Sequence, residues 1–290
     1  DKQLPEIITL AFAGTLIAVS ISAILTYYAT SYWMGVDFIA CLLFAAAISP
    51  TDPVAVLALL KSVNVSKSIE VKIAGESLLN DGVGIVIFTT ILEFAQAKGV
   101  PSLYNVLLFF AHEVFGGLIL GYIIAKCGVL LFRNTNSEAV RKEDIVWTIA
   151  LVNIAQFISM SLGVSPALCA VSLGLCLGRF FDSVPVARAK SLMQFWDIID
   201  ELLNFILFFL LGMEIIKLDI QHYQTMFSLG LIAITVTAIA RYVSVNISFL
   251  LAKIWRNYDN KTKNIIALGG IKGGLSLALV SVIPMNIPNK

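Results

Sequence analysis

The chain has 290 residues, of which 58% are hydrophobic and only 13% are charged. Soluble domains carry about 25% charged residues, so this composition, with a mean hydropathy of +0.89, indicates a membrane protein. The formal net charge of +1 gives no reason to expect nucleic acid or an acidic partner.

Nine apolar segments follow one another along the chain, each near the roughly 20 residues that cross a bilayer as a helix. Lipid offers no partner for unpaired backbone groups, so we expect helices; no segment shows the sustained two-residue alternation of a transmembrane barrel. The segments cover residues 7–29, 36–60, 73–96, 103–132, 145–162, 164–178, 196–216, 226–252 and 264–284. The sequence therefore predicts an all-α polytopic membrane protein with one membrane domain over residues 1–290.

The basic residues between these segments fall mostly on one side. If the N-terminus is cytoplasmic and the spans alternate, the inside loops hold 14 Lys and Arg residues and the outside loops hold 3. This bias is the positive-inside pattern, and it supports both the count of nine and the orientation. Lys72 is counted here in the inside loop before segment 73–96. Arg241 and Lys272 are left over, inside spans.

The second segment is interrupted by Pro50 and Pro53, which flank Thr51 and Asp52. Proline has no backbone N–H, so these residues would free two carbonyl groups of a continuous helix. Freed carbonyls beside the Thr51 hydroxyl and the Asp52 carboxylate would form a hard-oxygen environment suited to a small cation. The alternative is a simple proline kink, with Asp52 bonded to the loosened backbone.

The third segment carries a polar stripe. Ser77 and Asp81 are four residues apart, as are Glu76 and Asn80, so each pair shares a helix face. A carboxylate at bilayer depth usually marks an ion or proton route, and two acids on one buried stripe need a cationic partner. The two basic residues inside later spans are available for this. The alternative is a structural salt-bridge network without a transport role.

The ninth segment has four glycines around Lys272, and a helix this rich in glycine unwinds easily. Two interrupted spans favour an inverted repeat with the site where they cross, although the glycines could simply allow close helix packing. We predict unwinding near Thr51–Pro53 and Gly269–Gly273, with Asp52 close to Asp81.

Two motifs, Thr51-Asp52-Pro53-Val54-Ala55 and Glu76-Ser77-Leu78-Leu79-Asn80-Asp81-Gly82, resemble the bacterial NhaP and eukaryotic NHE type of sodium/proton antiporter. Further matching residues are Phe195-Trp196, Leu203-Asn204, Leu211-Gly212-Met213-Glu214, Arg241-Tyr242-Val243 and Gly269-Gly270-Ile271-Lys272-Gly273. The resemblance implies an NhaA-like inverted-repeat fold with crossing broken helices. It also implies about thirteen spans, of which this chain would hold the fourth to the twelfth, and a homodimer with a mobile core domain.

The resemblance also implies roles for individual residues. Asp81 would be the main cation and proton carboxylate, with Asp52 acting in the same site. The Thr51 backbone carbonyl and Ser77 would complete the coordination, and Glu76 would be a ligand or an ion-pair partner. The supporting residues would be Asn80, which bridges to the broken helix, and Arg241 and Lys272, which balance the acids.

The function implied is electroneutral sodium/proton antiport by alternating access, without enzymatic activity or a cofactor, in the membrane lipid of a bacterial inner membrane. The Asn80–Asp81 pair resembles the electroneutral subgroup. Lys272 departs from the family, which commonly has arginine there, and a buried lysine can lose its proton. The alternatives are potassium/proton antiport, since the same oxygens could hold Na⁺, Li⁺ or K⁺, a cation-sensing relative that does not transport, and a channel.

Overall fold

The computed structural model describes residues 4–52, 67–96, 102–133, 142–216, 223–252 and 260–284. Every regular element in these ranges is a helix, which confirms the predicted class. Five of the helices are long and apolar enough to cross a membrane, so the protein is an integral membrane protein with several spans. The chain divides into two compact units, Asp1–Pro101 with Met213–Lys290, and Ser102–Gly212.

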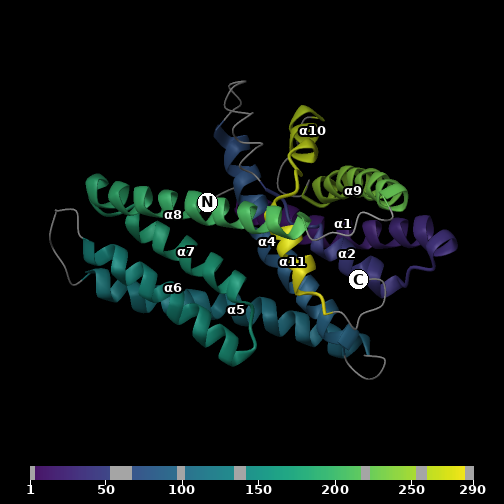
Figure 1. Ribbon diagram of the computed structural model, residues 1–290. Coiled ribbons are helices and arrows are strands. Elements are labelled where there is room, and N and C mark those ends of the chain that lie inside the picture. The colour runs from purple at the N-terminus through teal and green to yellow at the C-terminus, as the bar shows by residue number, and fades with distance from the viewer. Residues whose placement is uncertain are drawn as a thin grey trace. The chain divides into compact units, whose positions relative to one another are not determined.

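The first unit packs around α1. Its helices, labelled in Figure 1, are α1 (Leu4–Met34), α2 (Phe38–Ala47), α4 (Lys67–Gln96), α9 (Tyr223–Ala252), α10 (Asn260–Leu268) and α11 (Gly274–Val282). Helix α1 packs along α9 and also contacts α2 and α4, while α11 contacts α2 and α4. The segment that carries the polar stripe therefore contacts both elements in which interruptions were predicted.

Both predicted interruptions are present. Helix α2 ends at Ala47 and the chain from Ser49 to Asp52 is not helical, while residues 269–273 separate α10 from α11. The two breaks cross, because the Asp52 N–H donates to the Ile271 carbonyl at 2.7 Å. Pro53 and the rest of the second predicted segment lie outside the described residues.

A glycine makes this crossing possible. A Cβ atom added to Gly273 would lie 2.8 Å from the Cβ of Asp52, closer than two carbon atoms can pack. Any larger residue at position 273 would push the two breaks apart. The glycines of the ninth segment therefore serve close approach as well as unwinding.

The second unit consists of α5 (Leu103–Arg133), α6 (Lys142–Leu162), α7 (Pro166–Phe181) and most of α8 (Val186–Ile216). Helices α5, α6 and α7 pack side by side (Figure 1). Helix α7 begins where it does because the Ser165 hydroxyl accepts from the Leu168 N–H at 3.3 Å and Pro166 occupies the first turn, both of which favour a helix start. Helix α5 approaches α7 closely at Gly117, where an added Cβ would lie 2.7 Å from the Ser165 carbonyl oxygen.

Helix α8 is longer than predicted at its N-terminal end. It begins at Val186 instead of residue 196, so Arg188 lies within the helix and not in the loop before it. Its Nε and Nη2 atoms donate to the two carboxylate oxygens of Asp144 on α6, at 2.5 and 2.8 Å. The pair is buried, so the extra turns of α8 are held against α6.

The placement of Lys72 in a loop was wrong. Helix α4 begins at Lys67, and Lys72 lies within it, buried. Its ammonium group is 2.8 Å from the carboxylate of Glu6 on α1. Hydropathy alone reads such a lysine as the edge of a loop, because the pairing that lets it be buried comes from a distant segment.

Candidate cation site at the helix crossing

The break that follows α2 faces the polar stripe of α4. The Thr51 N–H, which no longer belongs to a helix, donates to Asp81 Oδ1 at 3.1 Å. The Ser77 hydroxyl donates to the Thr51 carbonyl and accepts from the Thr51 hydroxyl at 3.2 Å. The predicted proximity of Thr51, Ser77 and Asp81 is therefore confirmed.

Asn80 joins the same break to α1. Its Nδ2 donates to the Ser49 carbonyl at 3.2 Å and to the Thr51 hydroxyl at 3.0 Å. Its Oδ1 accepts from the hydroxyl of Thr15 on α1. The amide is buried and satisfied on both sides, so it ties the break to α1 and α4.

Glu76 is paired with Arg241. The guanidinium Nη1 and Nη2 atoms donate to the two carboxylate oxygens at 2.8 and 3.1 Å, and both residues are buried. Arg241 Nη2 also donates to the Ile266 carbonyl at 3.1 Å. This carbonyl belongs to the last turn of α10, where a positive charge is favourable. Of the two roles open to Glu76, the geometry favours the ion-pair partner.

Lys272 approaches the crossing from the break between α10 and α11. Its ammonium donates to the Ser49 carbonyl at 3.2 Å, the same oxygen that accepts from Asn80. We expected a carbonyl freed by proline to face a cation, and the cation that it meets here is Lys272. The Ser49 carbonyl, which lies beyond the end of α2, is thus hydrogen-bonded by side chains of the protein itself.

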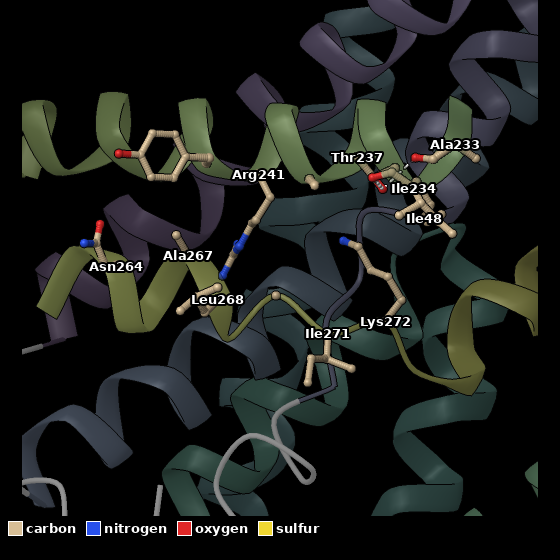
Figure 2. A pocket seen from close by; sticks show the side chains of 13 residues that line it. Ile48, Ala233, Ile234, Thr237, Arg241, Asn264, Ala267, Leu268, Ile271 and Lys272 are labelled. Atoms are coloured by element: carbon tan, nitrogen blue, oxygen red, sulfur yellow. Dashed lines mark hydrogen bonds between the residues drawn. The ribbon is translucent and has the colours of Figure 1, made fainter. Parts of the chain in front are cut away.

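A pocket of about 760 Å³ opens beside the two basic residues. In Figure 2, Arg241 points from α9 toward α10, and Lys272 extends from the break toward Ile48. Among its described lining residues, the charged ones are Arg241 and Lys272, and most of the others are apolar. The pocket therefore meets the cationic side of the crossing and not the carboxylates.

The two remaining carboxylates differ from Glu76 in exposure. Asp52 and Asp81 are each partly exposed, whereas Glu76, Thr51 and Ser77 are buried. An exchanging ion or proton must reach its site, so this contrast favours the two aspartates. No group of three or more His, Cys, Asp or Glu side chains that could together hold a metal ion occurs in the ranges that the structure describes, so carbonyl and hydroxyl oxygens would have to share in any coordination.

Sequence reasoning missed two contacts. The Thr15 hydroxyl donates to Asn80, and Glu6 pairs with Lys72. A polar residue in an apolar span faces the protein interior, so Thr15 was detectable as a site neighbour. Proline pointed to two freed carbonyl groups, but the partners of the Ser49 carbonyl, Asn80 and Lys272, depend on how the chain turns.

The match to known proteins extends over the whole chain. Residues 1–290 match the model of the family described as sodium/hydrogen exchanger, transmembrane. The chain is similar to the Na(+)/H(+) antiporter NhaP of Pseudomonas aeruginosa, with 34% identity over 286 residues that cover 95% of this chain and 66% of the relative. It is also similar to NhaG of Bacillus atrophaeus, with 29% identity, covering 96% of this chain and 52% of the relative.

The fold matches solved structures of the sodium proton antiporter MjNhaP1 from Methanocaldococcus jannaschii. One, at pH 8, has a TM-score of 0.71 and 21% identity and covers 94% of this chain and 66% of that one. A second has a TM-score of 0.74. The chain spans between half and two thirds of the length of the curated relatives described above. With a family match over every residue and the predicted helix crossing in place, the chain belongs to the sodium/hydrogen exchanger family of membrane transporters.

Proposed function

We propose that this chain forms the ion-binding part of a sodium/proton antiporter, in which the cation and the proton compete for Asp81. The observation that carries the proposal is the charge count at the crossing. Arg241 neutralises Glu76. Among the described residues of the crossing, Asp52, Asp81 and Lys272 then carry the other charges, with a formal sum of −1 when all three are ionised.

A charge sum of −1 fits one monovalent ion. An uncompensated charge inside a membrane protein is costly, so an empty, fully ionised crossing is unfavourable. One Na⁺ or one proton restores neutrality, and binding of either removes the need for the other. This accounts for coupled exchange of one cation for one proton without a separate gate.

The proposed ligands are oxygen atoms, which hard cations prefer. They are the Asp81 and Asp52 carboxylates, the Thr51 carbonyl and the Ser77 hydroxyl. Asn80 and Lys272 are assigned to positioning, because both hold the Ser49 carbonyl. Glu76 is assigned to pairing with Arg241.

The setting of the whole protein is also proposed. Positive-inside sorting supports a cytoplasmic start for residue 1, in a bacterial inner membrane, and nine spans in a single transporter domain over residues 1–290. The family resemblance supports alternating access and a homodimer. Cross-linking of the full-length protein in membranes tests the dimer, and cysteine labelling from either side tests the orientation.

Transport is tested with the full-length protein in proteoliposomes. A pH-sensitive dye inside the vesicles reports proton movement when Na⁺, Li⁺ or K⁺ is added outside. We expect saturable, cation-dependent proton flux with Na⁺. Proton flux with K⁺ and none with Na⁺ would show that potassium, and not sodium, is the exchanged cation. Cation binding without flux would indicate a sensor, and a cation current without proton movement a channel; either result would overturn the proposal.

A further inference from the structure

A second buried ion pair lies one helical turn from Glu76 and has no part in the proposed cation site. Lys72 Nζ is 2.8 Å from Glu6 Oε1, and each side chain is only 4% exposed. Glu6 belongs to the first turn of α1 and Lys72 to α4. Two apolar residues of similar volume often stabilise a protein at least as well as a buried ion pair. Stability alone therefore does not account for these charges.

The pair is the first of two polar contacts that align α1 with α4, which run in the same direction. The second is the hydrogen bond from Thr15 to Asn80. The two contacts are nine residues apart on α1 and eight apart on α4, which corresponds to about 13.5 and 12 Å of helix. One contact is an ion pair and the other reaches the amide that holds the break.

Apolar packing between these two contacts leaves other registers open. An apolar cluster that joins four helices consists of Leu10, Ile73, Val245, Phe249 and Ile266. Apolar contacts are not directional, and cores accept repacked arrangements when volume is kept. If α4 slipped by one turn, about 5.4 Å, it could bury a similar apolar surface. The ion pair does not tolerate the slip, because both charges would then be buried without partners.

A slip would also disturb a close contact beside the pair. A Cβ atom added to Gly75 would lie 3.1 Å from Cγ2 of Ile7, so the Ile7 side chain already packs closely against the backbone of α4. The ion pair next to this contact selects one register among those that apolar packing allows. That register places Asn80 beside Thr15 and Asp81 beside Thr51.

We propose that Glu6 and Lys72 are positioning residues of the transport site, which hold α4 in the register that presents Ser77, Asn80 and Asp81 to the break at residues 49–52. The inference rests on the proposed function for its transport measurement. Its structural measurement is independent of transport.

The main test uses the apolar double variant Glu6→Leu/Lys72→Met of the full-length protein. This variant leaves no unpaired charge, so it is expected to fold. With the four native cysteines replaced by alanine, spin labels are attached at Leu16→Cys and Leu78→Cys, two positions that are each 45% exposed. In this variant we expect the distribution of distances between the two labels to broaden, or to gain a second population shifted by about 5 Å, one helical turn.

The transport readout separates positioning from simple stabilisation. We expect the KM for Na⁺ of the double variant to rise about fivefold or more, within the range of couplings between contacting residues. The charge-exchanged variant Glu6→Lys/Lys72→Glu should recover both a single label distance and most of the affinity. If that variant does not fold, the apolar variant still decides the question through its label distance.

A matched control is available in the second unit. Asp144 and Arg188 form a pair of similar burial that joins α6 to α8. Asp144→Leu/Arg188→Met should leave the KM for Na⁺ unchanged. An unaltered label distance and KM in the folded Glu6→Leu/Lys72→Met protein would overturn the inference. If the wild-type protein showed no cation/proton exchange, the proposed function would be overturned. The label distance would still show whether the ion pair fixes the register of α4 against α1.

Discussion

At the scale of single residues, three carboxylates near the crossing have different surroundings. Glu76 has both oxygens bonded to Arg241, whereas Asp81 accepts from the Thr51 backbone N–H and is partly exposed. A carboxylate held by a bidentate guanidinium is a poor exchanger of ions. This leaves Asp52 and Asp81, and our proposal assigns the exchanged charge to Asp81.

Asp81→Asn should abolish cation-dependent proton flux while the protein still folds and inserts. The amide keeps the size of the carboxylate but has neither its charge nor a proton to exchange. Flux into proteoliposomes measures the effect, and thermal unfolding in detergent verifies the fold. Asp37→Asn is the matched control, because Asp37 is exposed before α2 and its side chain makes no capping bond. Exchange at a wild-type rate in folded Asp81→Asn protein would refute the assignment.

Lys272 stands where the family resemblance implies arginine, and we propose that its charge balances the nearby acids. If charge balance and the bond to the Ser49 carbonyl are its whole role, Lys272→Arg should keep exchange with a similar pH profile. Lys272→Met should lose stability or activity, because an acid is left without compensation and breaking such a pair costs about 3–5 kcal/mol. The pH dependence of exchange measures both.

The same measurement detects a lysine that takes part in proton transfer. In that case the arginine variant should fold normally but work over a narrower or displaced pH range, because arginine keeps its proton. Full activity and an unchanged pH profile in Lys272→Met would reject both roles.

At the scale of elements, the crossing depends on small residues at close contacts. A Cβ atom added to Gly84 on α4 would lie 2.8 Å from Ser49 Oγ and 3.1 Å from Pro50 Cγ. Ser49 is held there by its own hydrogen bond to the Ala46 carbonyl at 2.9 Å. The break after α2 therefore packs directly against α4 at Gly84, with no space for a Cβ atom between them.

Gly84→Ala should destabilise the protein by about 1–3 kcal/mol, the usual cost of overpacking, and weaken cation binding by displacing Thr51. Gly174→Ala in α7 is the control, because no described atom lies within 4 Å of its added Cβ. Alanine there should raise helix stability by up to about 1 kcal/mol. Unfolding temperature and the KM for Na⁺ follow both effects, and equal behaviour of the two variants would contradict the close contact.

The elements were predictable from the sequence to different degrees. Apolar length gave the position of α5, Leu103–Arg133, because lipid leaves a long apolar segment few alternatives to a helix. Proline and glycine gave the two breaks, because both residues weaken a helix wherever they occur. The start of α8 and the helical setting of Lys72 were not predictable, because each depends on a carboxylate from a distant helix, Asp144 or Glu6.

The same distinction holds within the site. The polar stripe placed Ser77 and Asp81 on one face, since four residues make about one turn. Thr51 was identified by the resemblance and by its neighbouring prolines. That Lys272 bonds the Ser49 carbonyl follows from how the breaks pass each other, and no local pattern encodes it.

At the scale of the whole molecule, the proposed charge count predicts how exchange responds to voltage. With Glu76 neutralised by Arg241, the crossing carries a formal −1 that one Na⁺ or one proton cancels. The occupied site should therefore be neutral in both directions, and a complete cycle should move no net charge. An imposed membrane potential, worth about 2.3 kcal/mol per charge per 100 mV, should leave the cation and proton gradients at which flux reverses unchanged.

The measurement clamps proteoliposomes with K⁺ and valinomycin and locates the Na⁺ gradient that balances a set pH gradient. Equal values at 0 and −100 mV support exchange of one cation for one proton. A balance point that moves with voltage would mean unequal stoichiometry, and another charge at the crossing would then have to titrate in the cycle. Lys272 is the first candidate, because Arg241 keeps its proton. A voltage-dependent wild type whose dependence disappears in Lys272→Arg would assign the extra charge to that lysine.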